Sequence, residues 1–158
     1  MKKRLTVAVV LGVLTMSARG QKLNESQVPA VVKIAFEKKY PSAKASWDKE
    51  DANYEANFKQ DGTAMSAVID KNGTIVETET DIPVRDLPQS VQYYMKKNYP
   101  GLKIEEAARI VKANGDVHYE AEVHHKDVIF DANGKFIKEA RIKFFLKSRP
   151  DKSGRLLS

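Results

Sequence analysis

Histidine and glutamate recur in one short segment, where these side-chain types could bind a metal or transfer protons. Four of them alternate with apolar residues: His118, Glu120, Glu122 and His124. A β-strand would place all four on one face. The two histidines would then lie roughly 20 Å apart, which is too far for one ion, and His125 would point to the opposite face. We interpret the segment as a solvated strand face and predict no metal site.

The sequence DANG at residues 131–134 resembles the start of a calcium-binding loop, in which oxygen ligands alternate along the chain. A complete loop of that kind needs glycine at its sixth position and glutamate at its twelfth. Gly134 is the fourth residue here, and extended segments flank it. We therefore predict a hairpin turn.

Residue arrangements typical of enzymes are missing from the sequence. The chain has no cysteine, no G-x-S-x-G elbow and no glycine-rich phosphate loop, and its histidines all lie within 118–125. One acid-rich stretch could supply paired carboxylates, as in glycosidases: Asp48, Glu50, Asp51 and Glu55. It coincides with a predicted strand–turn–strand, where solvated charge is the usual explanation. We predict a protein that is not an enzyme and uses no cofactor.

Residues 1–20 have the three parts of a secretory signal peptide. Basic residues at 2–4 precede the uncharged apolar stretch 5–16, and Ala18 and Gly20 supply the small residues of a cleavage site. The apolar stretch is shorter than the roughly 20 residues that a bilayer span needs. We predict cleavage after Gly20, no transmembrane span in the mature chain, and a periplasmic or secreted location.

Removal of the signal peptide changes the charge balance. The formal net charge of the whole chain is +6, and it falls to +2 without residues 1–20. Residues 147–158, which we predict to be a disordered basic tail, hold +3 of this. Residues 21–146 are thus close to neutral and lack the concentrated basic face that nucleic acid requires. Without cysteine, the fold must be held by its core rather than by disulfides.

An internal duplication organises the chain. Residues 28–41 read VPAVVKIAFEKKYP and residues 87–100 read LPQSVQYYMKKNYP, with five identities at an offset of 59. The tripeptide YEA then recurs at 54–56 and 119–121, and DKNG at 70–73 corresponds to DANG at 131–134. Because these matches occur in the same order in both parts of the chain, we infer that one structural unit is duplicated.

Each unit predicts one helix followed by four strands. The helices, at 28–41 and 87–100, carry an apolar stripe, have proline in the first turn and end at Tyr-Pro. Alternating polarity and Asn-Gly turns predict the strands: 43–50, 53–60, 64–70 and 74–80, then 102–112, 117–125, 127–131 and 135–144. The predicted fold is α+β, with two tandem helix-plus-four-stranded antiparallel meander (αββββ) modules whose sheets can join edge to edge. The predicted modules are 21–84 and 85–146.

The repeated Pro…Tyr-Pro helices and the strands that end in DKNG and DANG resemble the PepSY-like family of secreted bacterial proteins, also described as beta-lactamase-inhibitor-like. The resemblance covers residues 28–144 and implies a small, non-catalytic binding module. Related PepSY domains occur in peptidase propeptides and are thought to restrain proteases. The tandem inhibitors of similar fold present the open face of a continuous sheet to an enzyme. This chain differs from them in lacking cysteines and a matching inhibitory loop.

We therefore expect an exported protein that binds a protein or peptide of the cell envelope on its exposed sheet face, and that can inhibit a secreted hydrolase or peptidase. Trp47 is either buried beneath the helices or an exposed aromatic anchor. The candidate partner-binding residues are Trp47, Glu55, Asn57, Lys59, Glu120, Glu122 and His124. One alternative is a periplasmic small-ligand or metal-binding protein, which would use the groove between the modules or the face with His118 and His124. Another is a folding accessory.

Overall fold

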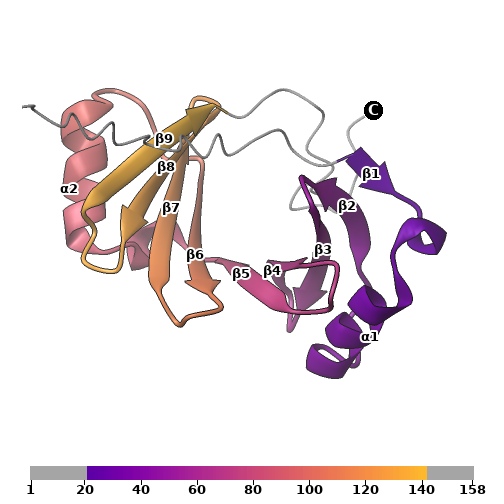
Figure 1. Ribbon diagram of the computed structural model, residues 1–158. Helices are drawn as coiled ribbons and strands as arrows, with labels where there is room; N and C mark the ends of the chain where they lie inside the picture. The colour runs from indigo at the N-terminus through magenta and orange to yellow at the C-terminus, as the bar shows by residue number, and fades with distance from the viewer. Residues whose placement is uncertain (1–20, 142–158) are drawn as a thin grey trace, which may run out of the picture.

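The computed structural model describes residues 21–141, which form two α-helices, two short 3₁₀ helices and nine strands (Figure 1). The first half of the chain contains β1 (Gln21–Leu23), η1 (Glu25–Gln27), α1 (Ala30–Lys39), β2 (Ser46–Glu50), β3 (Asn53–Gln60), β4 (Thr63–Ile69) and β5 (Ile75–Asp81). The second half contains η2 (Val84–Asp86), α2 (Gln89–Asn98), β6 (Glu106–Lys112), β7 (Val117–Val123), β8 (Lys126–Asp131) and β9 (Phe136–Arg141). The predicted signal peptide and basic tail lie outside the described residues.

All nine strands belong to one antiparallel sheet whose spatial order follows the chain from β1 to β9. The two halves meet where β5 pairs with β6, from Glu77 opposite Lys112 to Asp81 opposite Ala108. The α+β class is thus confirmed, and the joined sheet is consistent with two repeated modules. Strand β1 was not predicted, because three residues are too few to show a period.

Both helices form where the repeat predicts them, with shorter bounds. Each begins directly after a proline, and each ends at a tyrosine whose N–H donates to the last turn: Tyr40 to the carbonyl of Phe36, and Tyr99 to that of Met95, both at 2.8 Å. A proline follows each tyrosine and keeps it out of the helical region. No helix among residues 21–141 is both long and apolar enough to cross a membrane.

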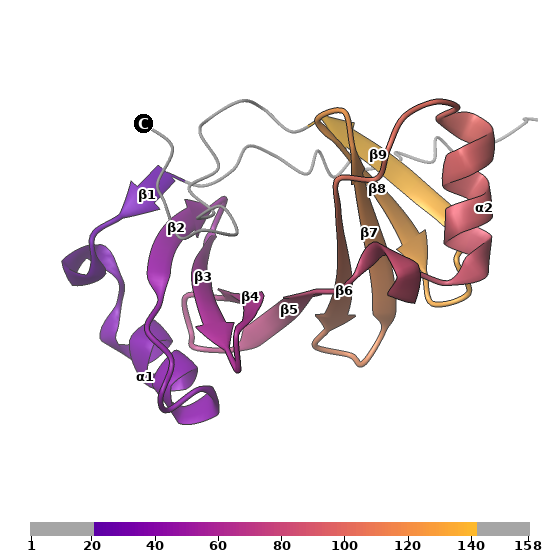
Figure 2. The same ribbon diagram turned by 180° about the vertical axis from the view of Figure 1, so that it is seen from behind.

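The two helices lie on the same side of the sheet. Strand register puts Ala56 and Ala67, which α1 covers, on one face, and it continues across the β5–β6 pair to Ala121 and Val128, which α2 covers. Figures 1 and 2 show α1 and α2 on the outer side of the curved sheet, at opposite ends of the molecule. We call the other side the concave face.

Each helix has its own hydrophobic core. The first is aromatic: the Phe36 ring lies 5.5 Å from Trp47, 5.0 Å from Phe58 and 5.4 Å from Tyr40, between centroids. The second core is built mainly from smaller side chains around Val91 and Phe130. Because each core has its own helix, neither half depends on the other's helix for burial.

Candidate functional site

Five of the seven candidate binding residues lie on the concave face. Glu55, Asn57 and Lys59 project from β3, and Glu120 and Glu122 project from β7. Strand register carries them across the joined sheet. Asn57 pairs with Ser66, Ser66 with Glu79 and Glu79 with Ile110, and Ile110 pairs with His118, two residues before Glu120 on β7. The sheet therefore brings residues of both halves onto one surface.

Trp47 is not part of that surface. Its side chain points to the opposite face of β2 and is 5% exposed, with its ring edge-on to Phe36. Of the two interpretations left open by the sequence, the structure supports burial beneath α1. Trp47 therefore cannot anchor a partner on the concave face.

The prediction that His124 shares a strand face with Glu122 is wrong. Strand β7 ends at Val123, which pairs with Lys126, and His124 and His125 form the two-residue turn between them, with φ of 46° and 63°. Such a turn needs positive φ at both positions, and it removes both histidines from the alternation. His118 alone remains on the concave face, so the metal-binding alternative loses its histidine pair. Among residues 21–141, no group of three or more histidine, aspartate or glutamate side chains is placed to hold a metal.

The segment that resembles a calcium loop is the β8–β9 hairpin turn, as predicted. Asp131 Oδ1 accepts hydrogen bonds from the N–H groups of Asn133 and Lys135, both at 2.9 Å, and Gly134 takes a positive φ of 76°. Asp70 binds Asn72 and Thr74 in the same way at the β4–β5 turn, at 2.8 and 2.9 Å. The aspartates therefore serve to shape equivalent turns in the two halves.

Acidic side chains dominate the concave face. By strand register it carries Asp48, Glu50, Glu55, Glu77, Glu79, Asp81, Glu106, Glu120, Glu122 and Asp127. Its lysines are fewer: Lys22, Lys59, Lys112 and Lys138. Lys112 forms an ion pair with Glu77 across the β5–β6 seam. The concave face therefore carries a net negative charge, with a few lysines among its acidic side chains.

The middle of the concave face is apolar. Val68, Ala108, Ile110 and Ile129 project to this side and are each less than a tenth exposed, although both helices lie on the other side. This floor was missed from the sequence. A signal exists, because the uninterrupted apolar runs in β4 and β8 are typical of strands buried on both faces.

Burial and mutual repulsion shift the pKa values of acidic side chains on this face. Burial, together with the negative charges of neighbouring acids such as Glu55 and Glu77, raises the pKa of Glu50 to about 7. Burial also raises the pKa of Asp48, against the opposing effects of Lys22 and of a hydrogen bond from Asn57. Burial and the neighbouring Lys112 lower the pKa of Lys138. Holding these carboxylates together therefore costs free energy at neutral pH.

Glu50→Gln is expected to raise the free energy of unfolding by about 1–2 kcal/mol at pH 8 and to leave it almost unchanged at pH 4. The folded-state pKa of about 7 exceeds the ordinary value of 4.5, so the folded chain binds more protons than the unfolded chain between these values. The Glu50 contribution to stability therefore falls as pH rises through that window, and glutamine removes this loss. Urea unfolding at both pH values measures it. Glu37→Gln, an exposed acid on α1, should show no such pH-dependent gain.

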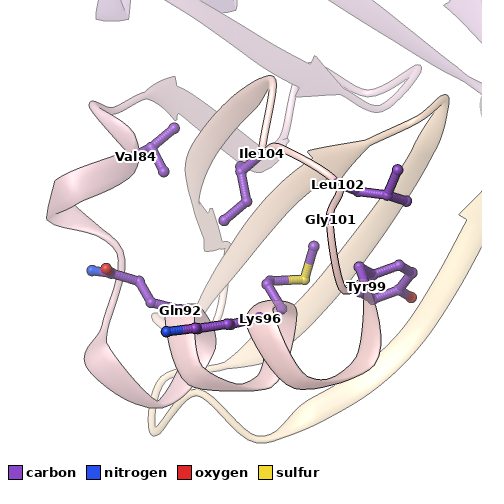
Figure 3. A pocket seen from close by; sticks show the side chains of 8 residues that line it. Val84, Gln92, Lys96, Tyr99, Gly101, Leu102 and Ile104 are labelled. Carbon is purple, nitrogen blue, oxygen red and sulfur yellow. The ribbon is translucent and has the colours of Figure 1, made fainter.

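A shallow hollow of about 230 Å³ lies on the helix side of the second half, beside α2 (Figure 3). Val84, Met95, Tyr99, Leu102 and Ile104 provide most of its lining, with Gln92 and Lys96 at its edge. The repeat explains its origin, because Met95 and Ala107 stand where the first half has Phe36 and Trp47. Its lining gathers no set of groups that could do chemistry, which leaves the concave face as the candidate site.

A sequence model of one protein family matches the chain in two overlapping regions, residues 14–77 and 52–138. Its description reads "putative beta-lactamase-inhibitor-like, PepSY-like". The two regions together contain both copies of the repeat, and the resemblance inferred from the sequence is confirmed. No curated protein matches the chain.

Solved structures from Bacteroides share the fold. A "putative periplasmic" protein from Bacteroides eggerthii is 18% identical with a TM-score of 0.65, covering 73% of this chain and 89% of its own. A DUF2874 family protein from Bacteroides uniformis is 21% identical with a TM-score of 0.63, covering 72% and 89%. A BLIP-like protein from Bacteroides fragilis is 19% identical with a TM-score of 0.58, covering 77% and 91%. At these identities the likeness shows the fold alone.

Proposed function

Because the chain belongs to the beta-lactamase-inhibitor-like, PepSY-like family, we propose that it is an exported, non-catalytic protein that binds a protein or peptide on its concave face. The observation that carries this proposal is the continuity of that face across the β5–β6 pair. A partner seated there would contact residues of both halves at once.

The size of the concave face suits a protein partner. Nine strands spaced about 4.8 Å apart make it roughly 40 Å wide, and strands of about six residues make it roughly 20 Å long. This area is close to the about 800 Å² that each partner contributes to a standard interface. Because the apolar floor is itself buried, a partner would contact mainly the polar and charged side chains around it.

Inhibition of a secreted hydrolase or peptidase is the finer form of this proposal. The family description supports it, since it likens these proteins to beta-lactamase inhibitors, and the Bacteroides fragilis structure is called BLIP-like. In this form of the proposal, the protein inhibits by covering the enzyme's active site. It needs no reactive residue of its own, because a tight complex already keeps substrate out.

The test of partner binding is affinity capture from envelope extract with matched charge-reversal variants. Glu55→Lys and Glu120→Lys, one on each half of the concave face, should each weaken binding of a stoichiometric partner by tenfold or more, or about 1.4 kcal/mol. Glu37→Lys, the same change on the exposed side of α1, should leave affinity unchanged. Thermal melts verify that all three variants fold.

Two results would contradict the proposal. In the first, Glu37→Lys removes the partner while the concave-face variants retain it. In the second, the purified protein turns over a substrate and a point mutation abolishes turnover without unfolding the chain. Assay of the captured partner, with and without added protein, separates inhibition from simple binding.

We also propose that the chain is cleaved after Gly20 and that its modules span residues 21–84 and 85–146, followed by the basic tail. Residues 1–20 have the three parts of a signal peptide, and η2 starts at Val84, next to the proposed module boundary. Mass spectrometry of the exported protein should give the mass of the chain from Gln21. A mass that includes residues 1–20 would contradict cleavage.

A further inference from the structure

Three hairpins turn at the same pair of residues, an asparagine followed by a glycine. The pairs are 72–73 between β4 and β5, 114–115 between β6 and β7, and 133–134 between β8 and β9. Asparagine before glycine readily loses ammonia, because no glycine side chain hinders the approach of the glycine nitrogen to the asparagine side chain. The three pairs therefore present the same chemistry in three structural settings.

The backbone has the same form at all three pairs. Each glycine has a positive φ, between 76° and 88°, and donates its N–H to the carbonyl three residues before it at 2.9–3.0 Å. That hydrogen bond must break before the glycine nitrogen can reach the asparagine side chain. The rate of ammonia loss therefore depends on how readily each turn opens.

An aspartate holds two of the turns closed. Asp70 Oδ1 and Asp131 Oδ1 each accept the N–H of the asparagine and the N–H of the residue after the glycine, at 2.8–2.9 Å. In the β6–β7 turn this position is occupied by Lys112, whose side chain forms an ion pair with Glu77 on β5 instead. Hydrogen bonds to a charged group are among the stronger ones. The β6–β7 turn therefore lacks the restraint that the other two share.

The same two turns also pack against helices. A Cβ added at Gly73 would lie 3.0 Å from both the side chain and the carbonyl oxygen of Val31 on α1, and one added at Gly134 would overlap Ser90 Oγ on α2. A Cβ added at Gly115 would meet nothing within 4 Å. The Asn-Gly pair of the β6–β7 turn can therefore move without first separating from a helix.

The Asn114 side chain is bonded within its own turn. Its Oδ1 accepts the N–H of Asp116 at 3.0 Å, and its Nδ2 donates to Asp116 Oδ2 at 2.7 Å. The first contact draws electrons away from the side-chain carbonyl carbon, which is the atom that the Gly115 nitrogen would attack. The N–H of Ala113 donates to the carbonyl of Val76 on β5 at 2.9 Å, which holds the start of the turn but not the Asn-Gly pair.

We propose that Asn114 is a site of spontaneous deamidation, and that it reacts faster than Asn72 and Asn133 in the folded protein. The Gly115 nitrogen loses its proton to solvent and attacks Cγ of Asn114, and the side-chain nitrogen takes a proton from water and leaves as ammonia. Water then opens the cyclic imide at either carbonyl, which gives aspartate or isoaspartate at position 114. Either product replaces the amide by a carboxylate that repels Asp116. This modification is independent of the proposed function.

Incubation of the folded, exported chain in ¹⁸O-labelled water at pH 8 tests the proposal, because ring opening places one ¹⁸O atom in the product. Digestion in ordinary water and mass spectrometry then count only the sites that reacted during incubation. Residue 114 should become labelled about tenfold or more faster than residues 72 and 133, which is the effect of about one hydrogen bond to a charged group. It should include isoaspartate, the mark of the cyclic imide. In urea the three rates should become similar.

Asp131→Ala tests the restraint on the β8–β9 turn. Loss of this carboxylate should raise the labelling rate of Asn133 severalfold in the folded chain. Asp61→Ala, the same change at the exposed β3–β4 turn, should leave that rate unchanged. Thermal melts verify that both variants fold.

Four results would overturn the proposal. The first is the absence of label at residue 114, and the second is labelling of Asn72 or Asn133 as fast as that of Asn114 in the folded wild-type chain. The third is a lead of Asn114 that persists in urea, which would assign its cause to the local sequence rather than to the fold. The fourth is an Asp131→Ala variant whose Asn133 reacts no faster than in the wild-type chain.

Discussion

Phe36→Ala is expected to lower the free energy of unfolding by about 3–5 kcal/mol. The Phe36 side chain is 3% exposed and touches three other aromatic rings, those of Tyr40, Trp47 and Phe58. Alanine would remove the ring at the centre of this cluster and leave a cavity between α1 and the sheet. Urea unfolding followed by the fluorescence of Trp47, the one tryptophan, measures the loss directly.

Ile34→Ala is the matched control for this change. It lies on the same helix and is 61% exposed, so its truncation removes little buried surface and should cost less than about 0.5 kcal/mol. Equal costs for the two substitutions would show that α1 does not cover the sheet through Phe36. The comparison therefore tests the placement of the helix as well as the size of the core.

Gly134→Ala is expected to destabilise the fold by about 2–4 kcal/mol. Gly134 has a φ of +76°, and a Cβ added there would overlap Ser90 Oγ and lie 2.9 Å from Ser90 Cβ. The same serine hydroxyl donates to the carbonyl of Asn133 at 2.9 Å, which fastens the β8–β9 turn to α2. The substitution therefore strains the turn and pushes it away from the helix.

Gly115→Ala separates the two contributions. Gly115 has a similar φ of +88° in the β6–β7 turn, but a Cβ added there meets nothing within 4 Å. Its replacement should cost only the backbone strain, about 1 kcal/mol. Thermal melts of the two variants should differ accordingly, and a larger loss for Gly115→Ala would contradict the packing of the turn on α2.

Much of the fold could be predicted because the chain repeats its local signals. Each helix lies between a proline at its start and Tyr-Pro at its end, and both observed helices fall within two residues of the predicted bounds. The Asn-Gly turns mark three hairpins, and alternation along β3 assigns Ala56 and Phe58 to the core. Each of these features depends on neighbouring residues alone.

The candidate site was predicted less well, because it depends on contacts between distant strands. His124 reads as a strand residue by alternation, yet pairing of Val123 with Lys126 forces it into a turn. The buried floor at Val68 and Ile110 arises only when β4 to β8 assemble in one curved sheet. The sequence was compatible with either a buried or an exposed Trp47, and in the structure its packing against Phe36 places it in the core.

The β5–β6 pair has a mechanical consequence. It joins the halves through backbone pairing over Glu77–Asp81, while the hydrophobic clusters of the described residues lie to either side of it. A single layer of sheet without a packed core beneath it twists more readily than the two-layered parts that flank it. We therefore expect the angle between the two halves to change more readily at the β5–β6 pair than the shape of either half does.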